Sequence, residues 1–356
     1  MRKRLFIPGP TEVFPEVLLQ QAKPMIGHRA KEFTELYTGI IDKLQKYHDS
    51  KQWATVTTSS GTLFMDITGR SLVKKKALVC VNGAFSKRFA ETIESCGKEI
   101  EIIDLPWGQA AKPEMIREKL AKGGFDTVVV CHNETSTGVR NPIYKIGEML
   151  HKEFPDIVYV IDSVSAMGGD KVEPEKIFSD LVFASSQKAF ALPPGLAIAF
   201  ASEKAIERAK EVPNRGTYTD LYDIYSYYQK KQQTPTTPNI SLMYALTYQL
   251  DRMLEETQEK RYQRHLEMAT WTQNWANKHF AMFPEKGYES LTVSTIKNTL
   301  DKSVSDLNKE LAKRSSTISD GYGDLKQKTF RIGHMGDWTL ADVKEVCWQI
   351  EEIWGL

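Results

Sequence analysis

Seven short apolar runs, each about as long as a β-strand, recur between residues 53 and 202. Valine, isoleucine and other residues that favour strands dominate these runs. The runs are 53–59, 77–82, 99–105, 126–132, 157–162, 180–186 and 196–202. Helical patterns lie between them, such as PEMIREKLAK and IYKIGEMLHKEF, the second of which carries its apolar residues on one helical face. This alternation is typical of a mostly parallel sheet with helices on both faces, so we predict an α/β fold.

The pattern changes after residue 202. Segment 214–239 is rich in tyrosine, threonine and proline, which predicts a loop-rich segment packed against another surface. A long helical stretch over about 239–280 follows it. The last part of the chain predicts a smaller α/β unit with strands at 291–296 and 329–336 and a closing helix at 340–354.

Length and charge narrow the class of protein. A chain of 356 residues fits one large and one small domain, and we expect an N-terminal segment (1–15), a large domain (16–255) and a small C-terminal domain (256–356). The 47 basic and 46 acidic residues leave a formal net charge of +1. This balance argues against nucleic acid or a membrane surface as the main partner and favours small molecules.

The cysteines and the absence of long apolar runs bear on location. Cys80, Cys96, Cys131 and Cys347 are widely spaced and form no C-x-x-C pair, so neither a disulfide framework nor a zinc site is predicted. No run approaches the roughly 18 apolar residues of a membrane span. We therefore expect core thiols in a cytoplasmic protein.

Polar residues gather where the predicted strands end, and this is the edge at which parallel sheets bind ligands. Ser60, Gly61 and Thr62 follow the first run and precede a helical pattern, which places hydroxyls and backbone N–H groups at a helix N-terminus. These residues can seat a phosphate or form an ordinary helix cap, and the local sequence allows both.

Asp162 ends the fifth run and Lys188 follows the sixth, so they face one crevice if those strands are neighbours. A carboxylate after the apolar IVYVI must find a cation or several donors, although a turn or cap would also explain it. A desolvated lysine can act as a nucleophilic amine toward an aldehyde, whereas most lysines are surface charges. An aldehyde, a cationic ring nitrogen and a phosphate occur together in pyridoxal phosphate.

The chain resembles the class V branch of the fold-type-I pyridoxal-phosphate enzymes, and most closely the alanine–glyoxylate / serine–pyruvate aminotransferase group. The resemblance covers nearly the whole chain in order. It rests on the motifs IPGPTEVFPEVL, MIGHRAKEF, TTSSGT, VNGAFSKRF, HNETSTGV, IDSVSAMGG, SSQKAFALPPG and TFRIGHMGD. It implies a seven-stranded sheet in a large domain, a smaller C-terminal α/β domain, and a homodimer.

The resemblance also implies roles for individual residues. Lys188 would bond to the cofactor aldehyde, Asp162 would pair with the pyridine nitrogen, Phe85 would stack on the ring and Thr135 would contact the ring hydroxyl. The phosphate would be held by Ser60, Gly61, Thr62 and Gln187, together with Thr236 of a second subunit. Arg331 would clamp the substrate carboxylate, with the backbone around Gly9 closing the other side.

Three positions depart from the family pattern. Phe85 stands where tryptophan is common, Thr62 where some relatives have histidine, and Gln233 where a tyrosine often contacts the phosphate across the dimer. The departures at Thr62 and Gln233 put cofactor affinity and subunit coupling in question. For His28 and His334 we expect packing or capping, not catalysis.

The resemblance implies transfer of an amino group from alanine or serine to glyoxylate or pyruvate. Transfer from 2-aminoethylphosphonate to pyruvate is an alternative, because those enzymes share much of the strand-end pattern and also need a carboxylate clamp. A non-catalytic accessory subunit is a third possibility, but Lys188, Asp162 and Arg331 argue against it.

Overall fold

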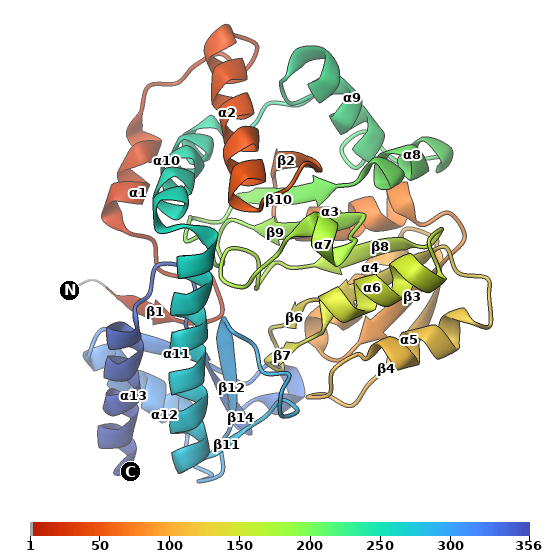
Figure 1. Ribbon diagram of the computed structural model, residues 1–356. Coiled ribbons are helices and arrows are strands. Elements are labelled where there is room, and N and C mark those ends of the chain that lie inside the picture. The colour runs from red at the N-terminus through yellow and green to blue at the C-terminus, as the bar shows by residue number, and fades with distance from the viewer. Residues whose placement is uncertain (1–2) are drawn as a thin grey trace.

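The computed structural model describes residues 3–356, and its largest element is a seven-stranded sheet (Figure 1). The strands lie in the order β2, β10, β9, β8, β5, β3, β4. Their bounds are β2 (Trp53–Thr58), β3 (Lys76–Val81), β4 (Glu99–Asp104), β5 (Thr127–Cys131), β8 (Val158–Asp162), β9 (Leu181–Ser185) and β10 (Leu196–Ala201). Each predicted run is therefore confirmed as a strand. Only β10 runs antiparallel to its neighbours, β2 and β9.

Helices cover both faces of this sheet, as predicted. Successive strand residues pack on opposite faces, so Leu78 belongs to one apolar core and Val79 to the other. One face is covered by α2 (Lys31–Tyr47), α5 (Pro113–Leu120), α6 (Ile143–Glu153) and α10 (Ile240–Glu256). The other is covered by α3 (Thr62–Ile67), α4 (Ala84–Ser95), α8 (Glu203–Glu211) and α9 (Leu221–Lys231). Because both faces are buried, the central strands are apolar at nearly every position.

A second, smaller sheet lies below the first in Figure 1. Its strands, in order, are β1 (Arg4–Phe6), β13 (Ser316–Asp320), β14 (Thr329–Gly333), β12 (Val293–Lys297) and β11 (Ala281–Met282). Its core is closed by α11 (Gln258–His279), α12 (Val304–Lys313) and α13 (Leu340–Trp354). The predicted C-terminal α/β unit is confirmed, and the N-terminal strand β1 joins it by pairing parallel to β13. The domain boundaries at 15 and 255 stay predictions.

Two segments differ from the sequence prediction. The stretch 239–280 is two helices, because Thr257 has a φ of 72° and its hydroxyl caps α11 by accepting from the Lys260 N–H at 3.3 Å. Segment 214–239 contains helix α9 and is not entirely a loop. Tyr225 and Tyr228 of that helix contact the ring of Trp53, so the segment is packed as expected.

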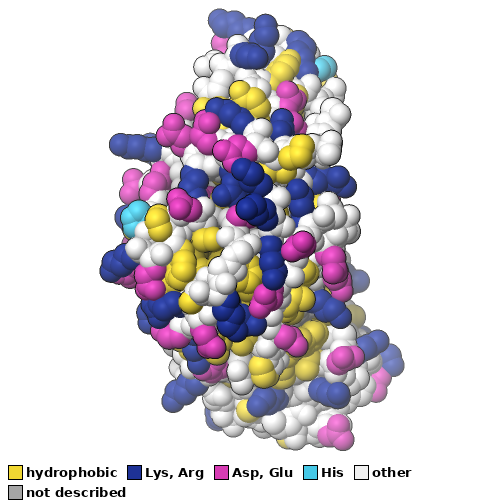
Figure 2. Space-filling view, turned by 90° about the vertical axis from the view of Figure 1, so that its right-hand side faces the viewer, with side chains coloured by type: hydrophobic (Ala, Val, Ile, Leu, Met, Phe, Trp, Pro, Cys, Tyr) yellow, Lys and Arg dark blue, Asp and Glu magenta, His cyan; other side chains and the backbone are white. Residues whose placement is uncertain are grey.

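The remaining elements are short. They are α1 (Pro15–Leu19), η1 (Gln20–Ala22), η2 (Thr68–Leu72), β6 (Asn133–Glu134), β7 (Val139–Arg140), α7 (Pro174–Ile177) and η3 (Gly323–Leu325). All four cysteines are free thiols, and every one except the half-buried Cys96 is buried. Within residues 3–356, no helix is long and apolar enough to cross a membrane. Figure 2 shows both signs of charge mixed over one face of the molecule, in keeping with the net charge of +1.

Candidate active site

The carboxyl ends of five strands open onto one cavity. Strands β8 and β9 are parallel neighbours, with Asp162 opposite Phe183, so Asp162 and Lys188 follow adjacent strand ends as the sequence predicted. The cavity holds about 570 Å³ of space, part of it open to solvent. Eight of the residues singled out from the sequence line it: Ser60, Gly61, Thr62, Phe85, Thr135, Asp162, Gln187 and Lys188.

Lys188 is held in the cavity by the N-terminal segment. Its Nζ donates to the carbonyl oxygen of Pro8 at 2.5 Å. Gly9 has a φ of 118°, and a Cβ there would lie 2.5 Å from the Cδ of Lys188, so only glycine allows this approach. Burial and the nearby charge of Arg331 lower the pKa of Lys188 to about 8. The side chain is therefore a neutral amine at far lower pH than an ordinary lysine.

Asp162 is 4% exposed at the end of β8. Its Oδ1 accepts from the backbone N–H of Val164 at 2.9 Å. Burial raises the pKa of this carboxyl to about 7, although the hydrogen bond from Val164 and the charge of Lys188 act in the opposite direction. A cationic group in the cavity would hold Asp162 in its ionised form.

The turn between β2 and α3 presents polar groups to the same cavity. The N–H of Gly61 donates to Ser185 Oγ at 3.3 Å, and that hydroxyl donates to Gln187 Oε1 at 2.6 Å. A Cβ on Gly61 would lie 2.5 Å from Cγ2 of Val164. A larger residue at position 61 would therefore have to displace the side chain of Val164 in the loop that follows Asp162.

Phe85 and Thr135 are positioned by buried hydrogen bonds. Phe85 lies in the first turn of α4, where the carboxylate of Glu134 accepts from the N–H groups of Phe85 at 3.2 Å and Ser86 at 2.8 Å. The hydroxyls of Thr135 and Ser165 lie 2.5 Å apart. Glu134 belongs to the ETSTG motif, but nothing in its local pattern indicated this anchoring contact.

Arg331 lies on β14 of the smaller sheet and is not among the residues that line the cavity, but its charge acts on Lys188. It is 8% exposed, and its Nη1 and Nε donate to the carbonyl oxygens of Thr135 at 3.2 Å and Asp320 at 3.1 Å. Within residues 3–356 it forms no ion pair with a carboxylate. Burial lowers its pKa to about 10, although the charges of Asp320 and Glu134 act in the opposite direction.

Thr236 lies apart from these residues. It lines a separate hollow with Thr58 and Tyr218 on the surface of the same chain. A contact between Thr236 and the cavity therefore depends on a second subunit. His334 is packed, as predicted: it is fully buried, its Nε2 lies 2.9 Å from Ser294 Oγ, and burial lowers its pKa to about 4.

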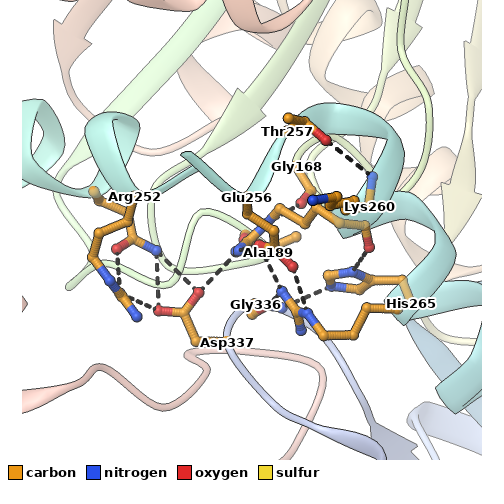
Figure 3. Close-up of polar contacts among 12 residues, drawn as sticks. Gly168, Ala189, Arg252, Glu256, Thr257, Lys260, His265, Gly336 and Asp337 are labelled. Atoms are coloured by element: carbon orange, nitrogen blue, oxygen red, sulfur yellow. Dashed lines mark hydrogen bonds and ion pairs between the residues drawn. The ribbon is translucent and has the colours of Figure 1, made fainter. Parts of the chain in front are cut away.

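A buried arginine, Arg261, connects the loops that carry the two central residues. Figure 3 labels its partners Gly168, Ala189 and Asp337. Arg261 of α11 donates at 2.8 Å to the carbonyl oxygens of Gly168, in the loop after Asp162, and Ala189, next to Lys188. Its third nitrogen donates to Asp337, in the segment after β14, at 3.0 Å. The sequence placed Arg261 in an ordinary helical stretch, and no local signal distinguished it.

Other lining residues were not predicted: Met65, Arg88, Cys131, Asn133, Val164 and Ser165. These residues lie in or near the strand-end motifs. Their short distance along the chain from the assigned residues is the signal by which they could have been predicted. The Oδ1 of Asn133 is buried without a hydrogen-bond partner, which leaves one acceptor at the cavity unsatisfied.

Comparison with known proteins identifies the family. The model of the class V aminotransferases matches residues 9–281. An uncharacterized aminotransferase of Methanocaldococcus jannaschii is 40% identical over 97% of this chain and 90% of its own length. Alanine–glyoxylate aminotransferase 1 of Saccharomyces cerevisiae is 28% identical over 93% of this chain and 91% of its own.

A solved structure agrees with these sequence matches. Aspartate aminotransferase of Thermus thermophilus has a TM-score of 0.89 at 26% identity, with 98% of each chain covered. The resemblance inferred from the motifs is therefore confirmed. The chain belongs to the class V aminotransferase family and is a pyridoxal-phosphate-dependent transaminase.

Proposed function

We propose that this transaminase moves an amino group from alanine or serine to glyoxylate or pyruvate. The donor leaves as its 2-oxo acid, and the acceptor becomes an amino acid. The yeast relative named alanine–glyoxylate aminotransferase supports this pairing. The observation that carries the proposal is the placement of Lys188 and Asp162 in one cavity with shifted pKa values.

The residues of the cavity fit pyridoxal phosphate. The amine of Lys188 has a pKa of about 8 and suits an aldehyde, and the carboxyl of Asp162 needs a cation such as a protonated pyridine. The hydroxyl-rich turn at Ser60 to Thr62 suits a phosphate. When bound, the cofactor supplies an electron sink for the negative charge that develops as the substrate loses its α-proton.

We assign the cofactor-binding roles to the lining residues. Lys188 bonds to the aldehyde, Asp162 pairs with the pyridine nitrogen, Phe85 stacks on the ring and Thr135 contacts the ring hydroxyl. The phosphate is held by Ser60, Gly61, Thr62 and Gln187, and by Thr236 of a second subunit. The Gly61 N–H already donates within the chain, so phosphate binding there exchanges one acceptor for another.

Arg331 binds the substrate carboxylate in this account. Its planar guanidinium can form two parallel hydrogen bonds with a carboxylate, and in this chain it has no anionic partner among residues 3–356. The backbone around Gly9, which packs against Lys188, closes the other side of the substrate site in this account. The Nζ of Lys188 is the group that accepts the proton from the substrate α-carbon and returns it.

Visible absorption tests which amino donor the protein uses. The protein is first incubated with pyridoxal phosphate, and each candidate amino donor is then added separately while the absorption band is followed. Alanine or serine should bleach the band, and Lys188→Ala should lack it. Bleaching by 2-aminoethylphosphonate and by neither amino acid would favour the phosphonate alternative and contradict the proposed donors.

We also propose a cytoplasmic homodimer. The four free cysteines suit a reducing compartment. The polar TPTTP loop, which places Thr236 outside the cavity of its own chain, suits a contribution to the site of a partner subunit.

A further inference from the structure

The two loops that carry Asp162 and Lys188 touch each other through their backbones. Gly168 lies in the loop that follows Asp162, and Ala189 comes directly after Lys188. A Cβ on Gly168, whose φ is 93°, would lie 3.3 Å from the carbonyl carbon of Ala189 and 3.4 Å from its oxygen. The relative position of these loops therefore sets how Lys188 lies with respect to Asp162.

Arg261 of α11 binds both loops at this contact. Its Nε donates to the carbonyl oxygen of Gly168 and its Nη2 to that of Ala189, each at 2.8 Å. Its Nη1 donates to Glu256 at 2.8 Å and to Asp337 at 3.0 Å. All three nitrogens of this buried side chain are thus engaged, and the planar guanidinium fixes the directions of the bonds. Figure 3 labels the four partners.

The two carboxylates have other arginine partners. Arg252 donates to Asp337 at 2.6 Å, and Arg264 donates to Glu256 at 2.7 Å. Among residues 3–356, only Arg261 donates to the carbonyl oxygens of both loops. What Arg261 alone supplies is therefore the link between the loops, and not the neutralisation of the carboxylates.

This link matters most when Lys188 acts on the substrate. Once the substrate amine has replaced Lys188 on the cofactor, the lysine has lost its covalent attachment there, and its own loop must hold it in place. Its Nζ then takes the proton from the substrate α-carbon and returns it. We propose that Arg261 is a positioning residue for this proton transfer, because it holds the loop of Lys188 against the loop that follows Asp162. This inference rests on the proposed role of Lys188, and Arg261 itself exchanges no proton.

Arg261→Lys is the variant that tests the proposal. Its ammonium group keeps a positive charge beside Glu256 and Asp337, but it lacks the planar fork that reaches two separate carbonyl groups. We expect kcat with alanine to fall about tenfold or more with little change in KM, because a misplacement of about 1 Å can cost a reaction about 100-fold in rate. Steady-state kinetics of the cofactor-loaded protein measure both constants.

Deuterated alanine identifies the step that is slowed. The isotope effect of deuterium at the α-carbon on a single turnover should be as large in Arg261→Lys as in the wild type, or larger. A loss of substrate binding or product release would make it smaller, because the transfer of the α-proton would then limit the rate less.

Arg264→Lys is the matched control. Arg264 lies on the same helix and shares the Glu256 carboxylate, but its other hydrogen bonds go to the carbonyl oxygens of Gly336 and Trp338. The same substitution there should leave kcat and the isotope effect unchanged. Urea unfolding of both variants establishes that each is folded under the conditions of the assay.

Each remaining result has a definite meaning. Wild-type kcat in Arg261→Lys, or a change in KM alone, would overturn this inference and leave the proposed function standing. An equal fall of kcat in both variants would give Arg261 a general structural role, and a reduced isotope effect would place the loss at another step, so either would also overturn it. Bleaching of the wild-type absorption band by neither alanine nor serine would contradict the proposed function, and this inference would fall with it.

Discussion

Lys188 is an amine whose reactivity is set by its surroundings. Burial and Arg331 lower its pKa to about 8 from an ordinary value of 10.5. Only the neutral amine attacks an aldehyde, so the rate at which the apoprotein binds pyridoxal phosphate covalently should rise with pH, with a midpoint near 8. Stopped-flow absorbance measures this rate.

Arg331→Gln serves as the control for that prediction. It removes the positive charge that disfavours the ammonium form, so the midpoint should move to higher pH. A wild-type midpoint near 10.5 would contradict the account of Lys188.

Asp162 should make the apoprotein less stable at neutral pH. Its pKa rises on folding from 3.8 to about 7, so the folded state binds the proton more tightly, and stability is lost as pH rises through that range. At pH 8, Asp162→Asn should raise the free energy of unfolding of the apoprotein by roughly 2–4 kcal/mol.

Urea unfolding at two pH values checks this prediction. At pH 3 the two proteins should be nearly equally stable, since the carboxyl is then mostly protonated in both states. With pyridoxal phosphate bound, the order should reverse, because asparagine offers no charge to a cationic ring nitrogen. An equal difference at both pH values would rule out titration of Asp162 as the cause.

Among single residues, those that could be predicted from the sequence are charged side chains placed at the end of an apolar strand. Asp162 follows a wholly apolar run, and Lys188 follows the next one, so burial of both charges could be foreseen. Arg88 and Asn133 belong to strand-end motifs, but their side chains alone did not single them out, because an exposed helical arginine and a polar residue after a strand have ordinary explanations. Their place at the cavity depends on contacts with distant segments.

At the scale of elements, α11 is joined to both central loops by Arg261. This arginine is 2% exposed and contacts Gly168, Ala189, Asp337 and Glu256. Arg261→Met should lower the free energy of unfolding by roughly 2–4 kcal/mol, because two carbonyl groups and two carboxylates lose a buried partner. Arg252 and Arg264 still pair with the carboxylates, which limits the loss.

Denaturant unfolding of matched variants tests this role. Lys260→Met changes the neighbouring exposed cation of the same helix and should have little effect. If both variants were equally stable, the network drawn in Figure 3 would not hold these loops.

The elements themselves were predictable where the pattern was local. All seven strands of the large sheet follow from short apolar runs, since central parallel strands are buried on both faces. The break at Thr257 was not predictable, because helical residues stand on both sides of it.

For the whole molecule, the order of the motifs sufficed to predict the α/β fold and the smaller C-terminal unit. The resemblance implied that the backbone around Gly9 lies at the site, but the strand pairing that brings it there did not follow from the sequence. Strand β1 pairs with β13, more than 300 residues away, and this pairing brings Pro8 and Gly9 to Lys188. Nothing in the local pattern of residues 3–9 indicates such a distant partner.

The proposed homodimer is a prediction about the whole assembly. Static light scattering of the active protein should give twice the chain mass of 40.5 kDa. Thr236→Ala should lower the affinity for pyridoxal phosphate, because Thr236 is proposed to contact its phosphate. The same substitution should leave the measured mass unchanged. A monomeric mass with full activity would contradict a site completed by a second subunit.

The central claim is that Lys188 is the residue to which pyridoxal phosphate bonds. It is tested most directly by reducing the cofactor-loaded protein with borohydride and locating the added mass by peptide mass spectrometry. The account predicts one pyridoxyl group per chain, on Lys188. A group on another lysine, or none after incubation with the cofactor, would contradict it.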